Sequence, residues 1–294
     1  MAKVHLESVP DLIKKAGEIR KDIARSARYA GNVHIGGPMS ATDIVTALYY
    51  KYLGFDPDNT EDPERNMFVL SKGHNGILLY CIFCDLGMYP WEELFDHYNT
   101  IGHTFGAHPN RKHVRGIEVS TGSLGHGLNW SIGFAHANRN EGIDSRIYCL
   151  LGDGEMEEGS NWEAIMYAGS HNLDNIVAIV DNNHCSASFV AGENMKWQWN
   201  SMGDCFKSFG WDVYEIDGTD MYAIDETLAN LPKVDLKNPG KPIAIISNTT
   251  KGQGVSYMME RSYAWHIGGL DDEKLAETEA LIDAYTEEQL KRRG

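Results

Sequence analysis

One stretch constrains the fold of this chain more than any other, and it reads LLGDGEMEEGSNWEAIMYAGSHNLDNIVAIVDNNHC. A short apolar run at 147–151 predicts a β-strand, which Gly152-Asp153-Gly154 ends in a tight turn. Apolar residues at helical spacing predict a helix over 158–171, and a second apolar run at 176–180 ends in Asp181-Asn182-Asn183. The stretch therefore predicts a strand, a helix and a second strand.

The two turns of this unit bring polar groups together. A crossover of this length joins parallel strands, so both turns emerge at the same edge of the sheet. If the strands are neighbours, they lie about 5 Å apart, and Asp153 and Asn183 can hold one ion. So few hard oxygen ligands suit an octahedral magnesium ion that is completed by water and phosphate oxygens. The ion implies a phosphorylated cofactor, and Gly152 and Gly154 leave room for its diphosphate beside the following helix.

The rest of the chain predicts an α/β fold. Its 294 residues and 42% hydrophobic content suffice for one large domain over residues 1–294. We expect a doubly wound, mostly parallel sheet with helices on both faces and the cofactor at the carboxyl ends of the strands. Strands are expected near residues 67–70, 117–120, 147–151, 176–180, 213–216 and 243–247.

Charge and composition exclude several classes of partner. The net charge is 26 − 42 = −16, which argues against nucleic acid and against a membrane surface. The sequence has no apolar run of membrane-spanning length, and its first residues lack a secretory signal. Five cysteines, an odd number in mostly apolar surroundings, fit a reducing cytoplasm and no disulfide framework.

Histidines are concentrated in one segment, GHTFGAHPNRKHVRG, which carries His103, His108 and His113 and follows closely after His97. The spacings match no common zinc pattern, and thiolates are missing. We therefore do not predict a structural zinc site from this segment.

With these motifs in place, the chain resembles a known family. Gly-Asp-Gly followed by Asn-Asn after 27 intervening residues (155–181) is similar to the thiamine-diphosphate signature. Further motifs narrow the resemblance to transketolases, and to their diphosphate-binding half, over nearly the full chain. Four histidines match the family by local context: His34 in HIGGPMS, His74 in SKGH, His108 before proline, and His266 shortly before Gly268-Gly269. In the family these histidines line the substrate channel and the diphosphate, so the resemblance implies a catalytic role for them.

The resemblance also implies a cofactor site for thiamine diphosphate. The segment STGSLGHG resembles TTGPLGQG, whose main chain around Gly122 and Leu124 meets the aminopyrimidine ring, with Ser123 in place of the usual proline. The implied cofactor-binding residues are His74, Gly122, Ser123, Leu124, Gly152, Asp153, Gly154, Glu158, Asn183 and His266. Asp153, Asn183 and the main-chain carbonyl of Cys185 would hold Mg²⁺, or Ca²⁺ or Mn²⁺ in its place. Glu158 matches a glutamate of the family's dimer interface, or is simply a carboxylate at a helix N-terminus. The remaining histidines His103, His113, His126, His171 and His184 are expected to be structural.

The family's pyrimidine half, with the glutamate that activates the aminopyrimidine, would begin about where this sequence stops. The resemblance therefore implies a C-terminal partner subunit, an α₂β₂ heterotetramer, and transfer of a two-carbon ketol unit from a ketose phosphate to an aldose phosphate. A specialised transketolase for a branched or sulfonated sugar stays open, because the residues that decide specificity lie largely on the partner. Weaker alternatives are a deoxyxylulose-phosphate-synthase-like protein, the decarboxylase subunit of a 2-oxo-acid dehydrogenase, and a non-catalytic assembly protein. The first normally carries all its domains on one chain, the second lacks the four histidines, and the third would lose the Asp, Asn and Gly residues that are present here.

Overall fold

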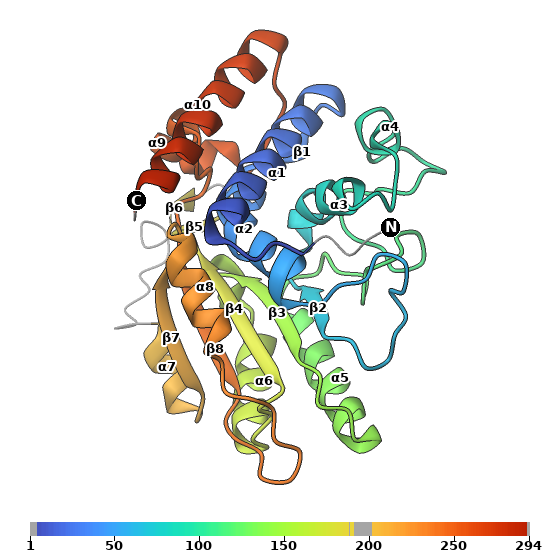
Figure 1. Ribbon diagram of the computed structural model, residues 1–294, viewed down its shortest axis with the longest axis vertical. Coiled ribbons are helices and arrows are strands. Elements are labelled where there is room, and N and C mark those ends of the chain that lie inside the picture. Colours follow the sequence, from blue (N-terminus) through green and yellow to red (C-terminus); the bar gives the residue numbers. More distant parts are fainter. Residues whose placement is uncertain (1–4, 188, 191–201, 293–294) are drawn as a thin grey trace.

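A parallel five-stranded sheet lies at the centre of the computed structural model, which describes residues 5–187, 189–190 and 202–292. Its spatial order is β2-β3-β4-β8-β7 (Figure 1). The strands are β2 (Met67–Leu70), β3 (Ile147–Gly152), β4 (Ile176–Asn182), β7 (Asp212–Asp217) and β8 (Ile243–Asn248). β3 and β4 are direct neighbours, and Gly152 lies opposite Asp181. The two central strands thus end side by side, as predicted.

Helices cover both faces of this sheet. One face carries α1 (Val9–Tyr29), α2 (Gly36–Ala47), α3 (Gly76–Asp85) and α8 (Met221–Ala229), and the other carries α5 (Gly127–Glu141), α6 (Gly159–Ser170) and α7 (Met202–Ser208). A hydrophobic core fills the space under each layer of helices: the first core lies on the α1 face, and the second lies on the α5 face. In β3, the side chain of Leu150 packs into the first core, and that of Leu151 packs into the second. Because both faces are buried, the strands read as continuous apolar runs rather than as alternating ones. The doubly wound α/β prediction is confirmed.

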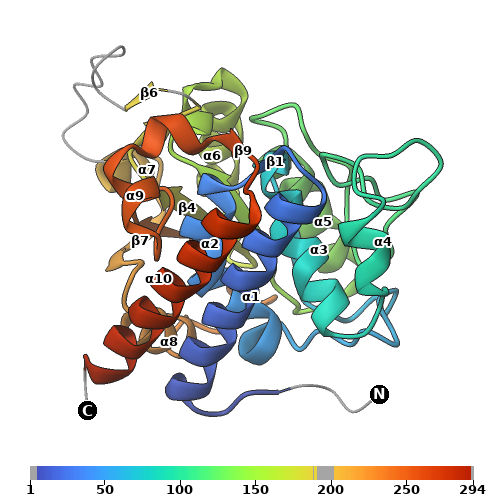
Figure 2. The same cartoon turned by 90° about the horizontal axis from the view of Figure 1, so that it is seen from above.

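Shorter elements complete the chain. α10 (Asp272–Lys291) runs beside α1 as an outer layer (Figure 2). Two-stranded pairs join β1 (Val33–His34) to β9 (Ile267–Gly268) and β5 (Cys185–Ser186) to β6 (Phe189–Val190). The remaining elements are α4 (Trp91–Phe95), α9 (Ser256–Glu260), a π-helical turn (Leu48–Tyr52) and 3₁₀ turns at Gly73–Asn75, Gly154–Glu157 and Ser262–Trp265. All five cysteines are free, and within the described ranges we find no helix long and apolar enough to cross a membrane.

The strand expected at 117–120 is wrong. This segment is a loop between Gly116 and Gly122, whose φ angles are 92° and 149°. Its apolar character has another cause, because the side chain of Ile117 is buried in the first core without a strand ladder around it. Glu118 faces Arg65 at 2.5 Å, so a salt bridge rather than a neighbouring strand holds the segment against the domain. Among the described residues, β2 therefore forms this edge of the sheet.

Candidate active site

A cavity of about 130 Å³ opens at the carboxyl ends of the central strands. The turns that follow β2, β3, β4 and β8 all reach this edge, because the four strands are parallel. Eight of the predicted site residues line the cavity: His74, Leu124, Gly152, Asp153, Gly154, Asn183, Cys185 and His266. The fold thus gathers in one place residues that lie far apart in the sequence.

The four histidines that were singled out by their motifs form one cluster. The ring centroid of His34 lies 5.5 Å from that of His74, 5.6 Å from that of His108 and 5.1 Å from that of His266. The rings of His74 and His266 are 5.2 Å apart. The β1 and β9 pair creates part of this arrangement, since the Ile35 N–H donates to the His266 carbonyl at 3.2 Å. The geometry supports a common role, and the role of each ring remains a prediction.

Burial keeps these histidines uncharged. It lowers the pKa of His34 to about 4, with a smaller contribution from His108 and Lys251. Burial likewise lowers the pKa of His266 to about 4, helped by the positive charge of Lys251. Burial also lowers the pKa of His108 and, together with the charge of Lys72, moves that of His74 well below its usual range. At neutral pH each ring therefore offers one N–H donor and one nitrogen acceptor, as acid–base work on sugar hydroxyls requires.

Asp153 and Asn183 fit a divalent cation. One oxygen of Asp153, Oδ1, accepts the Gly154 N–H at 2.9 Å, whereas the buried Oδ2 has no hydrogen-bond partner among the described residues. Burial, then the nearby charge of Asp181, raises the pKa of Asp153 to about 7. A buried carboxylate oxygen without a partner is costly, and a cation would satisfy it. The Asn183 amide oxygen, which accepts the Cys185 N–H at 3.2 Å, adds a second hard ligand of the kind that Mg²⁺ prefers.

Lys72 and Asp181 form a buried ion pair next to these two ligands. The sequence alone did not reveal this pair. Lys72 Nζ lies 2.7 Å from the Asp181 carboxylate, and the two side chains are 2% and 1% exposed. The same carboxylate accepts hydrogen bonds from the Ser40 hydroxyl at 2.7 Å and from Asn183 Nδ2 at 3.1 Å. Asp181 thereby fixes the orientation of the Asn183 amide. Both charged residues sit inside recognisable motifs, but their pairing depends on which strands are neighbours.

Glu155 is a third residue whose role the sequence alone did not reveal. Its buried carboxylate accepts hydrogen bonds from the Ser71 hydroxyl, the Gly125 N–H at 2.9 Å and the Gly152 N–H at 3.1 Å. Burial raises the pKa of Glu155. The carboxylate therefore joins the loop around Leu124 to the ends of β2 and β3.

Lys251 brings a further cation into the cavity. Its Nζ donates to the Ala187 carbonyl and lies 3.3 Å from His266 Nδ1. Burial lowers the pKa of Lys251 to about 8. Lys72 and Lys251 are thus two basic side chains at the edge where the predicted diphosphate would lie. The sequence carried a signal for Lys251, since this lysine lies in the glycine-rich turn that follows the last buried strand.

The glycines of the motif differ in what they allow. A Cβ on Gly152 would approach only the end of the Lys72 side chain, at 3.5 Å, so the main chain there is open to a ligand. A Cβ on Gly154 would lie 2.9 Å from Ser186 Cα, so this glycine is needed for packing against β5 as well. Gly122 lies against His108, whose ring a Cβ would meet at 3.3 Å.

Five predicted residues do not line the cavity: His34, His108, Gly122, Ser123 and Glu158. His34 and His108 belong to the histidine cluster, and Gly122 packs against His108. Ser123 lines a separate, open cleft of about 670 Å³ together with His126 and Trp130. Glu158 is exposed at the N-terminus of α6, where its side chain makes no capping hydrogen bond within the described chain. This position is compatible with both interpretations of Glu158, an interface residue or a helix-terminal carboxylate.

Comparison with known proteins assigns the family. Residues 15–288 match the family described as "Transketolase, thiamine diphosphate binding domain". A protein of Phocaeicola vulgatus that is named as one subunit of an apulose-4-phosphate transketolase is 40% identical over 249 residues, which cover 85% of either chain. The 6-deoxy-6-sulfo-D-fructose transketolase subunit SqwG of a Clostridium species is 36% identical over 247 residues, 84% of this chain and 87% of that one.

A solved structure agrees with this assignment. The transketolase of Campylobacter jejuni superposes with a TM-score of 0.81 at 27% identity, and the match covers 95% of this chain. It covers only 45% of the Campylobacter chain, whereas the two subunit proteins are matched over most of their length. The chain therefore belongs to the transketolase family and corresponds to its thiamine-diphosphate-binding domain.

Proposed function

We propose that this chain is the N-terminal, cofactor-binding subunit of a two-component transketolase. With a partner subunit it would transfer a two-carbon ketol unit from a ketose phosphate to an aldose phosphate. The observation that carries the proposal is the cluster of four neutral histidines, two of which share a cavity with the Asp153 carboxylate oxygen that has no partner among the described residues. Two relatives of similar length are themselves named as subunits, which supports an enzyme divided over two chains.

The cavity residues fit thiamine diphosphate and its metal ion. Asp153, Asn183 and the Cys185 main-chain carbonyl would hold Mg²⁺, or Ca²⁺ or Mn²⁺ in its place, and Lys72 and Lys251 would face the diphosphate. When bound, the cofactor supplies the carbon nucleophile and the electron sink that a two-carbon transfer needs.

The histidines would handle protons around the sugar. Because their rings are neutral at pH 7, a nitrogen can accept a proton from a sugar hydroxyl, and an N–H can donate to a developing alkoxide. Each such contribution is typically worth about 10²- to 10⁴-fold in rate. His34 and His108 would act near the substrate, and His74 and His266 near the diphosphate, in line with their neighbours Lys72 and Lys251.

The partner would carry the pyrimidine half. At about 130 Å³ the cavity among the described residues is smaller than the roughly 300 to 1,000 Å³ of a complete ligand pocket, which supports further walls from another chain. These walls would belong to a C-terminal partner chain, in an α₂β₂ heterotetramer with the cofactor between subunits. The free thiols also suit a reducing compartment such as the cytoplasm.

A second candidate differs only in the sugar. The two subunit relatives are named for apulose 4-phosphate and for 6-deoxy-6-sulfo-D-fructose, the second of which is a sulfonated sugar. The same four histidines and metal ligands would serve such a sugar equally well, because its distinguishing groups would contact the partner.

Ketol transfer from xylulose 5-phosphate to ribose 5-phosphate tests the proposal. The assay contains thiamine diphosphate and Mg²⁺ and uses this chain alone and then with its co-expressed partner. We expect transfer only in the mixture, its loss in Asp153→Ala, and its retention in Asp144→Ala, which removes an exposed carboxylate. Cofactor binding without transfer would move the substrate to a branched or sulfonated ketose. A complex that binds no thiamine diphosphate would rule out the enzymatic proposal.

A further inference from the structure

We propose that Glu93, His97 and His103 form a second metal site, distinct from the thiamine-diphosphate site, that binds a zinc-class divalent cation. Each residue offers one ligand atom, and these atoms lie within 4.8 Å of one another. Two imidazoles and one carboxylate are a known ligand set for zinc and suit neighbouring first-row metals. The sequence pattern did not reveal the site, because its third ligand is a glutamate rather than a histidine or cysteine.

The local fold explains how the three residues meet. Glu93 and His97 are four residues apart, about one helical turn, so they lie on the same side of α4 and the turn that follows it. Two consecutive turns then reverse the chain, with the Thr100 N–H bonded to the His97 carbonyl and the His103 N–H to the Thr100 carbonyl, both at 3.2 Å. Gly102, with φ 88°, permits the reversal.

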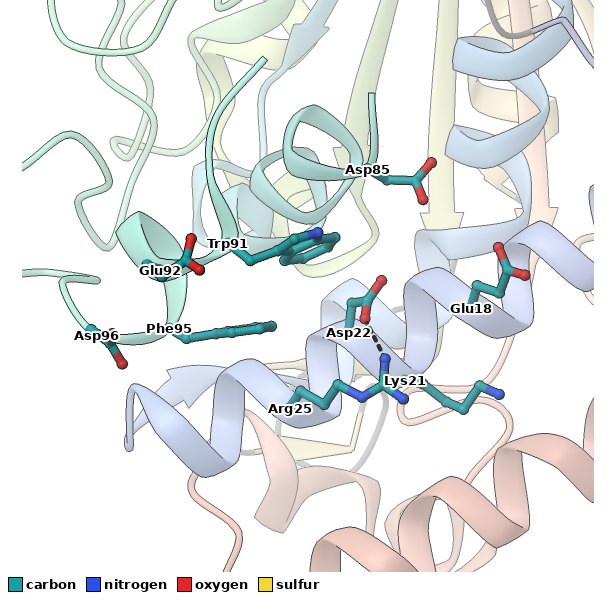
Figure 3. A pocket seen from close by; sticks show the side chains of 9 residues that line it. All are labelled: Glu18, Lys21, Asp22, Arg25, Asp85, Trp91, Glu92, Phe95 and Asp96. Atoms are coloured by element: carbon teal, nitrogen blue, oxygen red, sulfur yellow. Dashed lines mark hydrogen bonds and ion pairs between the residues drawn. The ribbon is translucent and has the colours of Figure 1, made fainter. Parts of the chain in front are cut away.

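The base of this loop is closed by main-chain bonding. The Asn99 N–H donates to the Phe105 carbonyl at 2.6 Å, and Phe105 is buried with its ring stacked on Tyr80 at 4.5 Å. α4 is fixed in turn, because the rings of Trp91 and Phe95 lie 5.3 Å apart, and Phe95 also meets Tyr29 of α1 at 5.4 Å. Figure 3 shows the two rings side by side next to α1. Both elements that carry ligands are therefore anchored in the absence of an ion.

The ligand atoms are already partly arranged. Glu93 Oε1 accepts the Thr104 N–H at 2.7 Å, which leaves Oε2 directed at His103 Nδ1, 3.3 Å away. The rings of His97 and His103 stack with centroids 3.9 Å apart and an angle of 16°, so one ring must turn before both nitrogens face a common ion. Zinc bonds of about 2.0–2.1 Å place neighbouring ligand atoms about 3.3 Å apart, so the largest closure needed is about 1.5 Å. Side-chain rotation can supply this closure, since Glu93 and His103 are 20% and 35% exposed.

The position of the site gives it a structural role. It joins α4 to the loop at 97–105, and this loop leads within three residues to His108 of the active-site cluster. A bound ion would hold that approach to His108 in place without touching the substrate. The partial exposure also lets the ion enter from solvent and leaves room for water as a fourth ligand.

Zinc binding to the full chain, purified without a histidine tag, tests the site. Equilibrium dialysis with Zn²⁺, followed by elemental analysis, should find one tight ion. Because His97 and His103 are ligands, His97→Ala and His103→Ala should each weaken binding by more than the roughly 10- to 100-fold that loss of an outer-shell partner costs. Glu93→Gln keeps the shape of the side chain but removes its charge, and should weaken binding by a smaller factor than either alanine variant. Co²⁺ in place of Zn²⁺ should give the strong visible bands of a four-coordinate ion, and these bands should disappear in His97→Ala.

Two controls separate this site from the histidine cluster of the cavity. His113→Ala removes an exposed histidine of the same segment and should leave the tight ion in place. The double variant His34→Ala/His266→Ala disrupts the cavity cluster and should also retain it. Loss of the tight ion in this double variant, or unchanged binding in both His97→Ala and His103→Ala, would overturn the proposal. If an alanine variant does not fold, Glu93→Gln takes its place: weaker zinc binding supports the site, and unchanged binding contradicts it.

Discussion

The positive charge of Lys72 is almost completely buried, and its ion pair with Asp181 offsets the free energy of removing that charge from water. We expect Lys72→Met to destabilise the chain by about 3–5 kcal/mol, because Asp181 would remain as a buried charge without its ionic partner. The hydrogen bonds that Asp181 would keep, from Ser40, Asn183 and Thr249, come from neutral groups and do not replace an ammonium group. Denaturant unfolding of the chain without cofactor measures the change in the free energy of unfolding.

The matched controls for this pair are a double variant and an exposed pair. Lys72→Met/Asp181→Leu removes both charges and should recover much of the loss. Lys207 and Asp204 form a comparable pair at the surface, with side chains 54% and 60% exposed, and Lys207→Met should change stability by less than about 1 kcal/mol. A Lys72→Met effect as small as that of Lys207→Met would contradict the view that the buried pair supports the site.

His34 should make the stability of the chain depend on pH. Burial lowers its pKa in the folded state to about 4, below the unfolded value of about 6.5. As pH falls from 6.5 to 4, the unfolded chain binds a proton that the folded chain does not, so the contribution of His34 to stability is lost in this window. Wild type should therefore lose stability more steeply than His34→Gln between pH 6.5 and 4.

The effect of His34 is measured as the difference in stability between wild type and His34→Gln at each pH. A difference is needed because other groups change the stability in the opposite direction. The pKa values of Asp22 and Glu118, for example, are raised by burial to about 6 and 7, which favours the folded state as pH falls. These contributions cancel between wild type and His34→Gln. His113→Gln, at an exposed position, provides the matched control, and parallel curves for wild type and His34→Gln would refute the assignment.

At the scale of elements, α5 contains two glycines that should respond in opposite ways to the same change. Gly127 begins the helix directly against β2, and a Cβ there would lie 2.3 Å from the Ser71 Cβ. Gly133 lies on the exposed side, and a Cβ there would meet no described atom within 4 Å. Gly127→Ala should therefore destabilise by about 1–3 kcal/mol, as overpacking does, whereas Gly133→Ala should stabilise by about 0.5–1 kcal/mol. Thermal unfolding of the two variants tests this, and a harmless Gly127→Ala would show that the junction can relax.

Elements could be predicted from sequence where local pattern and tertiary environment agree. The apolar runs at 147–151 and 176–180 form strands that are buried on both faces of the sheet, so their apolar pattern predicted the strands correctly. The strand prediction for 117–120 was wrong because Ile117 is buried although it lies in a loop. Burial of one side chain does not distinguish a strand from a loop. Strand order could not be predicted, because it depends on contacts between segments far apart in the chain.

The same reason explains what was found and missed in the site. Motif resemblance singled out the four histidines one by one, since each has a local signature, whereas Asp153 and Asn183 followed from the turns at the ends of two predicted parallel strands. Lys72, Asp181 and Glu155 act through partners from other strands or loops, so their signal appears only once β2, β3 and β4 are placed side by side. The trio of Glu93, His97 and His103 depends likewise on two turns that reverse the chain.

At the scale of the whole molecule, the face carrying α5 and α6 exposes large apolar side chains. Trp130 on α5 is 54% exposed, and Met166 and Tyr167 on α6 are 54% and 40% exposed. Trp130 also lines the open cleft beside Ser123, a residue of the predicted cofactor site. Exposed apolar groups next to an incomplete site are typical of a surface that another chain covers. We therefore expect the partner subunit to bind here.

Trp130→Glu should weaken assembly with the co-expressed partner by about 2 kcal/mol or more, because buried tryptophans are frequent hot spots of protein interfaces and a carboxylate there would be desolvated. Analytical ultracentrifugation of the mixture measures the dissociation constant. The control is Leu236→Glu, at a 37% exposed leucine in the loop before β8. This loop is bonded to Arg146 and Asp174, at the amino-terminal ends of the strands, and so lies at the opposite end of the sheet from the cavity. Both variants should unfold at the wild-type midpoint as isolated chains, since neither side chain belongs to the core. If Trp130→Glu assembles as tightly as Leu236→Glu does, the partner covers another face, and the cavity must be completed from there.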